Sequence, residues 1–150
     1  MARRIRRIMH ATDFSKASGR ALEESINLAK QNNAELLVVN VVEPAGQYAI
    51  GEDYGGAELY IKMEEAAKQD AERSMQKLMR KLGQAKVKAK SLLLKGIAYD
   101  QIVKAAKNRK ADMIVIGTHG RTGISKLFMG SVAGKVISLA RCPVLTVRGK

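Results

Sequence analysis

The order of apolar and polar positions along the chain predicts strands and helices in regular alternation. Five short apolar runs are typical of strands, and the segments between them carry apolar residues at the spacing of helices. Continuous apolar runs such as Leu36–Val42 and Met113–Gly117 indicate strands covered on both faces, which is typical of parallel sheets. The predicted strands lie at 4–11, 36–42, 87–94, 113–117 and 144–147, and the predicted helices at about 17–32, 57–82, 99–108 and 131–140.

This succession predicts an α/β fold with a five-stranded parallel sheet and helices on both faces. The length of 150 residues fits a single domain spanning residues 1–150, without an internal repeat. Apolar residues alternate with lysine from Val87 to Lys90, which predicts a strand near a sheet edge, and the strand at 144–147 is expected at an edge as well. Asn33 and Gly83 are expected to end the first two helices, and Met63 and Met79 to fill the core.

The composition of the chain indicates the cellular compartment of the protein and how its charge is distributed. No apolar run approaches the roughly 18 residues of a membrane span, and the basic N-terminus lacks the apolar segment of a signal peptide. The single cysteine, Cys142, fits a reducing compartment, and a structural role is expected for it. These features predict a cytoplasmic protein. Charge is divided unevenly, because residues 1–75 carry a net charge of −2 and residues 76–150 a net charge of +15.

The stretch after the fourth predicted strand carries the candidate chemistry. Gly117 breaks the apolar run, Gly120 follows, and Gly130-Ser131 opens the last predicted helix after nine more residues. The N–H groups at a helix N-terminus are unpaired and partly positive, so phosphate binds there readily. Glycine leaves out the Cβ atom that would hold such a group away. The pattern therefore predicts a phosphate-binding loop in the basic half of the chain.

Two standard phosphate-binding motifs are excluded by counting. The P-loop has four residues between its glycines, followed by Lys and then Ser or Thr, whereas three residues separate Gly130 from Gly134 and Val136 follows Lys135. The dinucleotide fingerprint has its glycines in the first strand–helix turn, where residues 11–20 contain only Gly19. The glycine spacing here belongs to neither motif.

With Asp13 at the end of the first apolar run, this G-x-x-G, nine-residue, G-S pattern resembles the universal stress protein family in its nucleotide-binding branch. The resemblance covers essentially the whole chain. It implies a Rossmann-like sheet of strand order 3-2-1-4-5, whose reversal between strands one and four would bring Asp13 and Gly117 into one crevice. One departure is Ala11, which stands where nucleotide-binding relatives often have proline and which loosens the turn before Asp13.

The resemblance also implies a ligand and its contacts. The ligand would be ATP, or alternatively ADP or AMP, with Mg²⁺ held through the phosphates. Asp13 and Val41 would hold the adenosine, Val41 through its backbone. The implied binding residues are Ala11, Thr12, Asp13, Val41, Gly117, His119, Gly120, Gly130, Ser131 and Val132. The apolar strand Val144–Val147 is poorly protected as a free edge, which predicts a homodimer through this strand; the alternative is that a neighbouring loop of the same chain covers the edge.

Several of these residues have simpler roles open to them. Asp13 or Ser15 would cap the following helix, and His119 would bond to the backbone of its loop rather than to phosphate. Arg121 and Lys126 would neutralise phosphate charge or extend into solvent. The residues alone leave these alternatives open.

Catalytic chemistry is not evident from the sequence. Two histidines, one cysteine and scattered carboxylates suggest no metal site and no catalytic residues, and no general base is apparent to orient an attacking water. The favoured function is an ATP-binding regulatory protein of the stress-response type, with little or no hydrolysis and a regulatory protein partner of unknown identity. The alternatives are a nucleic-acid-binding protein that uses the basic half, against which the 4% aromatic content speaks, and a slow ATPase of a related nucleotide hydrolase fold.

Overall fold

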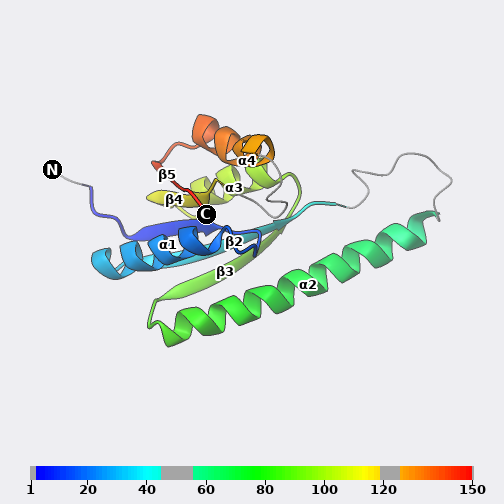
Figure 1. Cartoon of the computed structure of the whole chain (residues 1–150), viewed down its shortest axis with the longest axis horizontal. Helices are drawn as coiled ribbons and strands as arrows, with labels where there is room; N and C mark the ends of the chain where they lie inside the picture. The colour runs from blue at the N-terminus through cyan, green and yellow to red at the C-terminus, as the bar shows by residue number, and fades with distance from the viewer. Residues whose placement is uncertain (1–2, 45–55, 119–125, 150) are drawn as a thin grey trace.

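The computed structural model describes residues 3–44, 56–118 and 126–149, with the backbone alone for residues 126–130. Its strands and helices alternate along the chain, as Figure 1 shows. The strands are β1 (Arg7–Ala11), β2 (Glu35–Val42), β3 (Ala89–Lys95), β4 (Met113–Gly117) and β5 (Val144–Val147). The helices are α1 (Gly19–Asn32), α2 (Gly56–Gln84), α3 (Ala98–Asn108) and α4 (Lys126–Leu139).

All five strands lie in one parallel sheet of order β3-β2-β1-β4-β5, so the predicted fold and strand order are confirmed. β1 lies at the centre, where Met9 pairs with Leu37 of β2 on one side and with Ile114 of β4 on the other. β3 and β5 form the two edges, as expected from the lysine alternation of the one and the position of the other.

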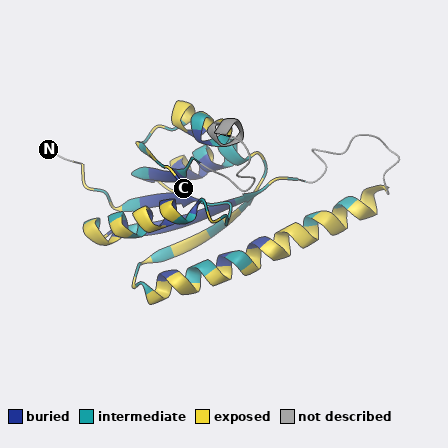
Figure 2. Cartoon of the chain, viewed as in Figure 1, coloured by how far each residue is buried: buried dark blue, intermediate teal, exposed yellow. Residues whose placement is uncertain are grey.

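Two apolar cores cover the two faces of the sheet. Ile8 of β1 belongs to the core under α1 and α2, while the next residue, Met9, belongs to the core under α3 and α4. Successive side chains of a strand point to opposite faces, so each buried strand feeds both cores. Figure 2 shows this burial concentrated in the central strands. Both faces must be covered, which explains the continuous apolar runs in β2 and β4.

The helix α2 extends well beyond the sheet. Its 29 residues span about 43 Å, whereas the eight residues of β2 span about 26 Å. The overhanging N-terminal part exposes apolar side chains, including Ile61 at 65% and Met63 at 49% (Figures 1 and 2). The expectation that Met63 fills the core is therefore wrong, because the buried residues of α2 are Ala71, Met75 and Leu82, all nearer its C-terminal end. Met79, nearer the C-terminal end, does pack partly against the core.

Three helices end in the same way, and this corrects one predicted boundary. Asn33, Lys86 and Lys110 each adopt a left-handed backbone conformation after α1, α2 and α3. Each donates its N–H to the carbonyl three residues back, and the next residue donates to the carbonyl five residues back, which is the Schellman arrangement. Asn33 ends α1 as predicted, but Gly83 lies inside α2, because Lys86 takes the left-handed position instead.

Other predicted boundaries shift by a few residues. β1 begins at Arg7 rather than Arg4, and β3 runs from Ala89 to Lys95 rather than from 87 to 94. The largest difference is in α4, which begins at Lys126 rather than Ser131 and ends at Leu139. Glycine weakens a helix by about 1 kcal/mol but does not prevent it, whereas leucine and methionine favour it. The chain therefore enters the helix before Gly130.

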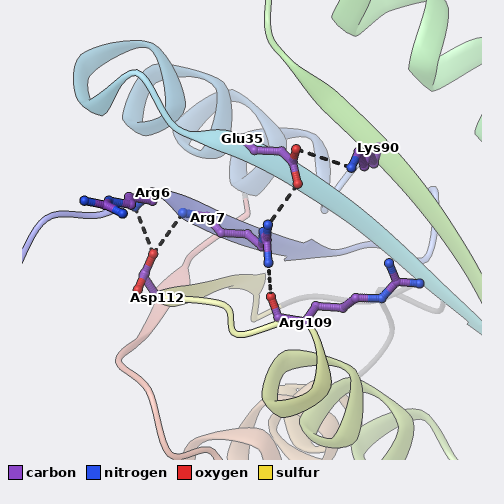
Figure 3. Close-up of polar contacts among 6 residues, drawn as sticks. All are labelled: Arg6, Arg7, Glu35, Lys90, Arg109 and Asp112. Carbon is purple, nitrogen blue, oxygen red and sulfur yellow. Dashed lines mark hydrogen bonds and ion pairs between the residues drawn. The ribbon is translucent and has the colours of Figure 1, made fainter.

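An ion cluster fastens the amino ends of the central strands, as shown in Figure 3. Asp112, just before β4, accepts hydrogen bonds from the backbone N–H groups of Arg6 and Arg7, both at 2.9 Å. The Arg7 side chain pairs with Glu35 at 3.3 Å and donates to the carbonyl of Arg109. These contacts tie the starts of β1, β2 and β4 together, at the end of the sheet away from the predicted ligand crevice.

A fully buried histidine lies in β1. His10 Nδ1 lies 3.2 Å from the carbonyl oxygen of Val115, so Nδ1 carries the proton and Nε2 has no partner among the described residues. Burial lowers the pKa of His10 from its ordinary value of 6.5 to about 4, against smaller upward effects of the Val115 hydrogen bond and the charge of Asp13. His10 is thus a neutral residue of the core.

The stability of the folded protein is expected to decrease as the pH is lowered, because His10 is buried in its neutral form. Between pH 6.5 and 4 the unfolded chain binds a proton that the folded chain excludes, so the free energy of unfolding decreases as pH falls through this range. From pH 7.5 to 5 this single group contributes a loss of about 2 kcal/mol. Urea unfolding at both pH values measures it. The loss should be smaller in a His10→Leu variant by that amount, and an equal loss in both proteins would contradict the assignment.

Candidate functional site

The strand order reverses next to β1, and this places a crevice at the carboxyl ends of β1 and β4. β1 leads into α1 on one face of the sheet, whereas the connection to β4 passes through α3 on the other face. The two connections leave the sheet in opposite directions and so separate at this point, where parallel α/β sheets bind their ligands. The crevice was expected from the strand order that the resemblance implied.

The turn after β1 is held by side chains in an uncommon backbone conformation. Asp13 Oδ1 accepts a hydrogen bond from Ser15 N–H at 2.9 Å, and Thr12 Oγ1 accepts one from Phe14 N–H at 3.0 Å. Phe14 itself has a φ of 63°, which is uncommon for a residue with a bulky side chain. Asn40 of β2 donates from Nδ2 to the carbonyl of Thr12 at 2.9 Å. Together these bonds fix the strained turn.

Asp13 does not cap α1, so that simpler interpretation is wrong for this residue, whereas Ser15 Oγ does accept the N–H of Ser18 at the start of the helix, at 3.2 Å. Ser18 is the N-cap residue, and its side chain makes no capping hydrogen bond. Asp13 lies five residues before Ser18, and one of its carboxylate oxygens closes the turn through Ser15 N–H. The turn thus orients the Asp13 carboxylate from within the loop rather than from the helix end.

The backbone of β2 borders the crevice on one side of β1. Val39 accepts a hydrogen bond from Thr12 N–H, and Ala11 is the last residue of β1 paired with β2. Alternate residues of a strand direct their N–H and C=O groups toward the same neighbour. The peptide groups of Val41 therefore face the space beyond the end of β1. The Val41 side chain packs partly against the core under α3 and α4.

β4 borders the crevice on the other side of β1. Thr118 N–H donates to the carbonyl of Val147 in β5 at 3.0 Å, so the peptide groups of the preceding Gly117 face the opposite side, toward the end of β1. A Cβ atom at Gly117 would lie 3.7 Å from Ser18 Cα and 3.8 Å from the Ala21 side chain. Gly117 therefore lies directly against the start of α1.

Five predicted binding residues thus meet at the carboxyl edge of the sheet: Ala11, Thr12, Asp13, Val41 and Gly117. His119 and Gly120 lie outside the described residues. Gly130, Ser131 and Val132 lie within α4, so the prediction that Gly130-Ser131 forms the N-terminus of this helix is wrong. Because α4 begins at Lys126, its unpaired N–H groups belong to the turn that starts there.

Asn40 belongs to the site but was missing from the predicted residues. It is 8% exposed, and its amide links β2 to the turn that carries Asp13. The sequence did carry a signal for it, because Asn40 is the one polar residue within the apolar run from Leu36 to Val42. A buried amide in such a run requires a hydrogen-bond partner, here the carbonyl that follows β1.

The described residues offer neither a metal centre nor a membrane span. No group of three or more His, Cys, Asp or Glu side chains within them is arranged to hold a metal ion. Among the helices in the described part of the chain, none is both long enough and apolar enough to cross a bilayer. What the edge presents is backbone hydrogen-bonding groups on either side of a single carboxylate.

The fold and the crevice define the class: a doubly wound, Rossmann-like α/β protein whose candidate site lies where the strand order reverses. The model of the universal stress protein family matches residues 4–148, and the chain belongs to this family. It is 38% identical over 141 residues to a universal stress protein of Thermus aquaticus, covering 94% of this chain and 97% of the relative. It is 35% identical over 143 residues to the universal stress protein MJ0531 of Methanocaldococcus jannaschii, and the match covers 95% of this chain and 82% of that protein.

Solved structures share the fold over nearly the whole length. The hypothetical protein MJ0577 superposes with a TM-score of 0.84 at 25% identity, covering 99% of both chains. An Arabidopsis thaliana universal stress protein, At3g01520, was solved with AMP bound and superposes with a TM-score of 0.69 at 20% identity, covering 97% of this chain and 92% of that one.

Removal of the Asn40 amide tests its role in the turn. Asn40→Ala should lower the free energy of unfolding by about 1–2 kcal/mol, because the Thr12 carbonyl loses a buried donor. Asn32 provides the control, since it also donates to a carbonyl but only within its own helix, to Leu28. Asn32→Ala should change stability by less than about 0.5 kcal/mol. Urea titrations of both variants measure the difference, and equal losses would argue against a special role for Asn40.

Proposed function

We propose that this universal stress protein binds an adenine nucleotide, ATP by preference, in the crevice at the carboxyl ends of β1 and β4. The carrying observation is the arrangement around the end of β1, where the peptide groups of Val41 and Gly117 face the same space from two sides and Asp13 stands between them. Peptide N–H and C=O groups recognise the edge of a base, and a carboxylate suits the hydroxyls of a ribose. The AMP bound to the Arabidopsis protein of the same fold supports this choice of ligand.

The phosphates would extend from Gly117 toward α4, with Mg²⁺ carried on them. Positive charge favours this direction, because residues 76–150 hold the net charge of +15 and the N-terminal end of α4 adds its own partial charge. His119, Gly120, Gly130, Ser131 and Val132 are the proposed phosphate contacts. In a helix that begins at Lys126, the amides of residues 130–132 are committed to carbonyls one turn earlier. Contact through these amides therefore requires the first turn of α4 to unwind when the nucleotide binds.

The proposed role is regulatory rather than catalytic, with slow or no hydrolysis. Hydrolysis needs a group that orients the attacking water, and Asp13 is already engaged in the turn through Ser15. Binding would instead report nucleotide level to a protein partner, inside the reducing compartment that the single cysteine suggests.

Asp13→Asn tests the site without disturbing the turn. Asparagine keeps an oxygen that accepts from Ser15 N–H, so the loop persists while the charge is lost. A hundredfold excess of Mg-ATP over its Kd stabilises the wild type by about 2.7 kcal/mol, which raises Tm by on the order of 5–10 °C. The variant should bind ATP about tenfold more weakly or worse, since a hydrogen bond to a charged group contributes about 1.5–3 kcal/mol.

Calorimetric titration measures these affinities, and Asp70→Asn is the matched control. Asp70 is an exposed carboxylate on α2 that pairs with Arg73, so its replacement removes the same charge far from the crevice. ATP affinity should be unchanged in this control. Equal weakening in both variants would indicate a general charge effect, and unchanged affinity in Asp13→Asn would move the nucleotide away from β1.

We also propose that the protein is a homodimer through β5. This strand is a sheet edge, so the N–H and C=O groups along its outer side have no neighbouring strand of the described sheet. Its exposed face is apolar at Leu145, which is 36% exposed. Antiparallel pairing of β5 with its copy would satisfy both edges and close the assembly by two-fold symmetry.

Leu145→Lys should convert the dimer to a monomer, because a charge on an edge strand opposes strand pairing. Sedimentation velocity at tens of micromolar measures the change. Ile61→Lys is the control, since Ile61 is an exposed apolar residue on α2, remote from β5. The control should remain dimeric. A monomeric wild type at this concentration would refute the proposed dimer, and dissociation of the control would place the interface on α2.

A further inference from the structure

A cavity lies at the opposite end of the sheet from the crevice. It has a volume of about 320 Å³ and opens between the C-terminal ends of α3 and α4, beside the residues that precede β1, β4 and β5. Small-molecule sites fall mostly in the range of about 300–1,000 Å³, so this one has room for a compact ligand. The proposed nucleotide site does not include any of its lining residues.

Four cationic side chains line this cavity: Arg3, Lys107, Lys110 and Arg141. They come from three segments of the chain, the N-terminal stretch, the end of α3 and the residues after α4, so the fold gathers them rather than any one run of sequence. The turn that ends α3 fixes the backbone of one of them, because Lys110 occupies the left-handed position of this Schellman turn. The cavity mouth therefore concentrates positive charge.

Nearby negative charge offsets only part of the positive charge at the cavity mouth. Asp112 pairs with Arg3 at 3.3 Å through Oδ1, while its Oδ2 accepts the two backbone N–H groups of β1. Burial acts to raise the pKa of Asp112, but these hydrogen bonds and Arg3 outweigh it and hold the pKa below its ordinary value. This carboxylate is thus ionised and already fully engaged. Within the described residues, no ion pair involves Lys107, Lys110 or Arg141.

The helix ends supply the competing explanation for the lysines. The C-terminal ends of α3 and α4 each carry roughly half a negative charge, which attracts cations. With Asp112 included, four positive charges still leave an excess of about two. Stabilisation of the helix ends therefore accounts for only part of this cluster.

The inner surface of the cavity is apolar. Val103, Ala106 and Leu139 contribute to it, and the half-buried Cys142 adds a thiol. Burial raises the pKa of this thiol, against smaller lowering effects of its backbone hydrogen bond and of Arg3, so the thiol is neutral at pH 7 and adds no negative charge. The described lining residues include no aromatic ring and no Asn or Gln side chain. These are the groups that proteins use to stack on or read a nucleobase.

We propose that this cavity binds a small amphipathic anion, with a carboxylate, sulfonate or phosphate head at the four cations and a short aliphatic tail against Val103 and Leu139. The head matches the uncompensated positive charge, and the tail matches the apolar interior. A nucleotide fits less well, because the cavity lacks groups for its base. The protein would then carry two ligand sites, one at each end of its parallel strands.

Cys142 provides a direct test, because it is the only cysteine of the chain and lines the cavity. The probe is decanoate at concentrations where it is monomeric, and the readout is the rate of Cys142 alkylation by the neutral reagent iodoacetamide, followed by mass spectrometry. Decanoate should slow alkylation in a saturable manner. Decanol, which has the same tail without the charge, and acetate, which has the charge without the tail, should protect much less.

Charge variants separate the cavity from general attraction to a basic protein. Lys107→Gln with Arg141→Gln should raise the concentration of decanoate needed for half-protection about tenfold, since two exposed charge contacts are lost. Lys77→Gln with Lys88→Gln removes the same charge from exposed positions outside the cavity and should leave that concentration unchanged. All four residues are exposed, so both doubly substituted proteins should fold.

Three outcomes would overturn the proposal. Absence of protection by decanoate would show that the cavity does not accept an amphipathic anion. Equal weakening in the two doubly substituted proteins would reduce the effect to net charge. Protection by vesicles of phosphatidylglycerol and phosphatidylcholine, but not by monomeric decanoate, would assign a membrane surface as the ligand instead.

Discussion

The pairing of β1 with β2 on one side and with β4 on the other is the constraint on which the rest of the structure depends. β1 has only five residues, yet its side chains enter both cores and its two edges hold the two halves of the sheet together. Because the chain crosses to β2 over one face and reaches β4 over the other, the ends of β1 and β4 lie next to each other without a helix between them. The candidate nucleotide crevice is a direct result of this topology.

The two ends of the sheet are built from different interactions. At the carboxyl end, backbone peptide groups border an open space, and the side chains of Asp13, Thr12 and Asn40 are used to hold a strained turn. At the amino end, ion pairs and charged hydrogen bonds around Asp112 and Arg7 lock the strand starts together. The first end is suited to admit a ligand, because the peptide groups of Val41 and Gly117 face the crevice from two sides. The second is closed at its centre by these contacts, and its flank near α3 and α4 is hollow.

Positive charge is concentrated in the second half of the chain. The basic second half of the chain supplies α3, α4 and the strands beside them, so both candidate anion sites draw on it. Its lysines are not equivalent, however. Lys104 pairs with Asp100 within α3, and Lys135 lies over the ring of Tyr99 at 4.4 Å, where it joins α4 to α3. Net charge alone therefore says little about which residues hold a ligand.

The sequence by itself determined the alternation of strands and helices, the parallel sheet and the edge position of β3, because periodicity and β-branched runs are local properties. The resemblance carried by Asp13 and the glycine spacing supplied the strand order.

Other features of the structure could not be predicted from the local sequence pattern. Gly83 and Gly130 were predicted as helix boundaries but lie inside helices, since a glycine costs a helix only about 1 kcal/mol and neighbouring residues and packing outweigh it. Met63 was predicted in the core, but its exposure depends on which part of α2 packs against the sheet. The position of Asn40 against Thr12, and the gathering of Arg3, Lys107, Lys110 and Arg141 around one cavity, were decided by the tertiary structure alone. Such contacts join residues up to 138 positions apart, and only the packing of helices on the twisted sheet brings them within reach.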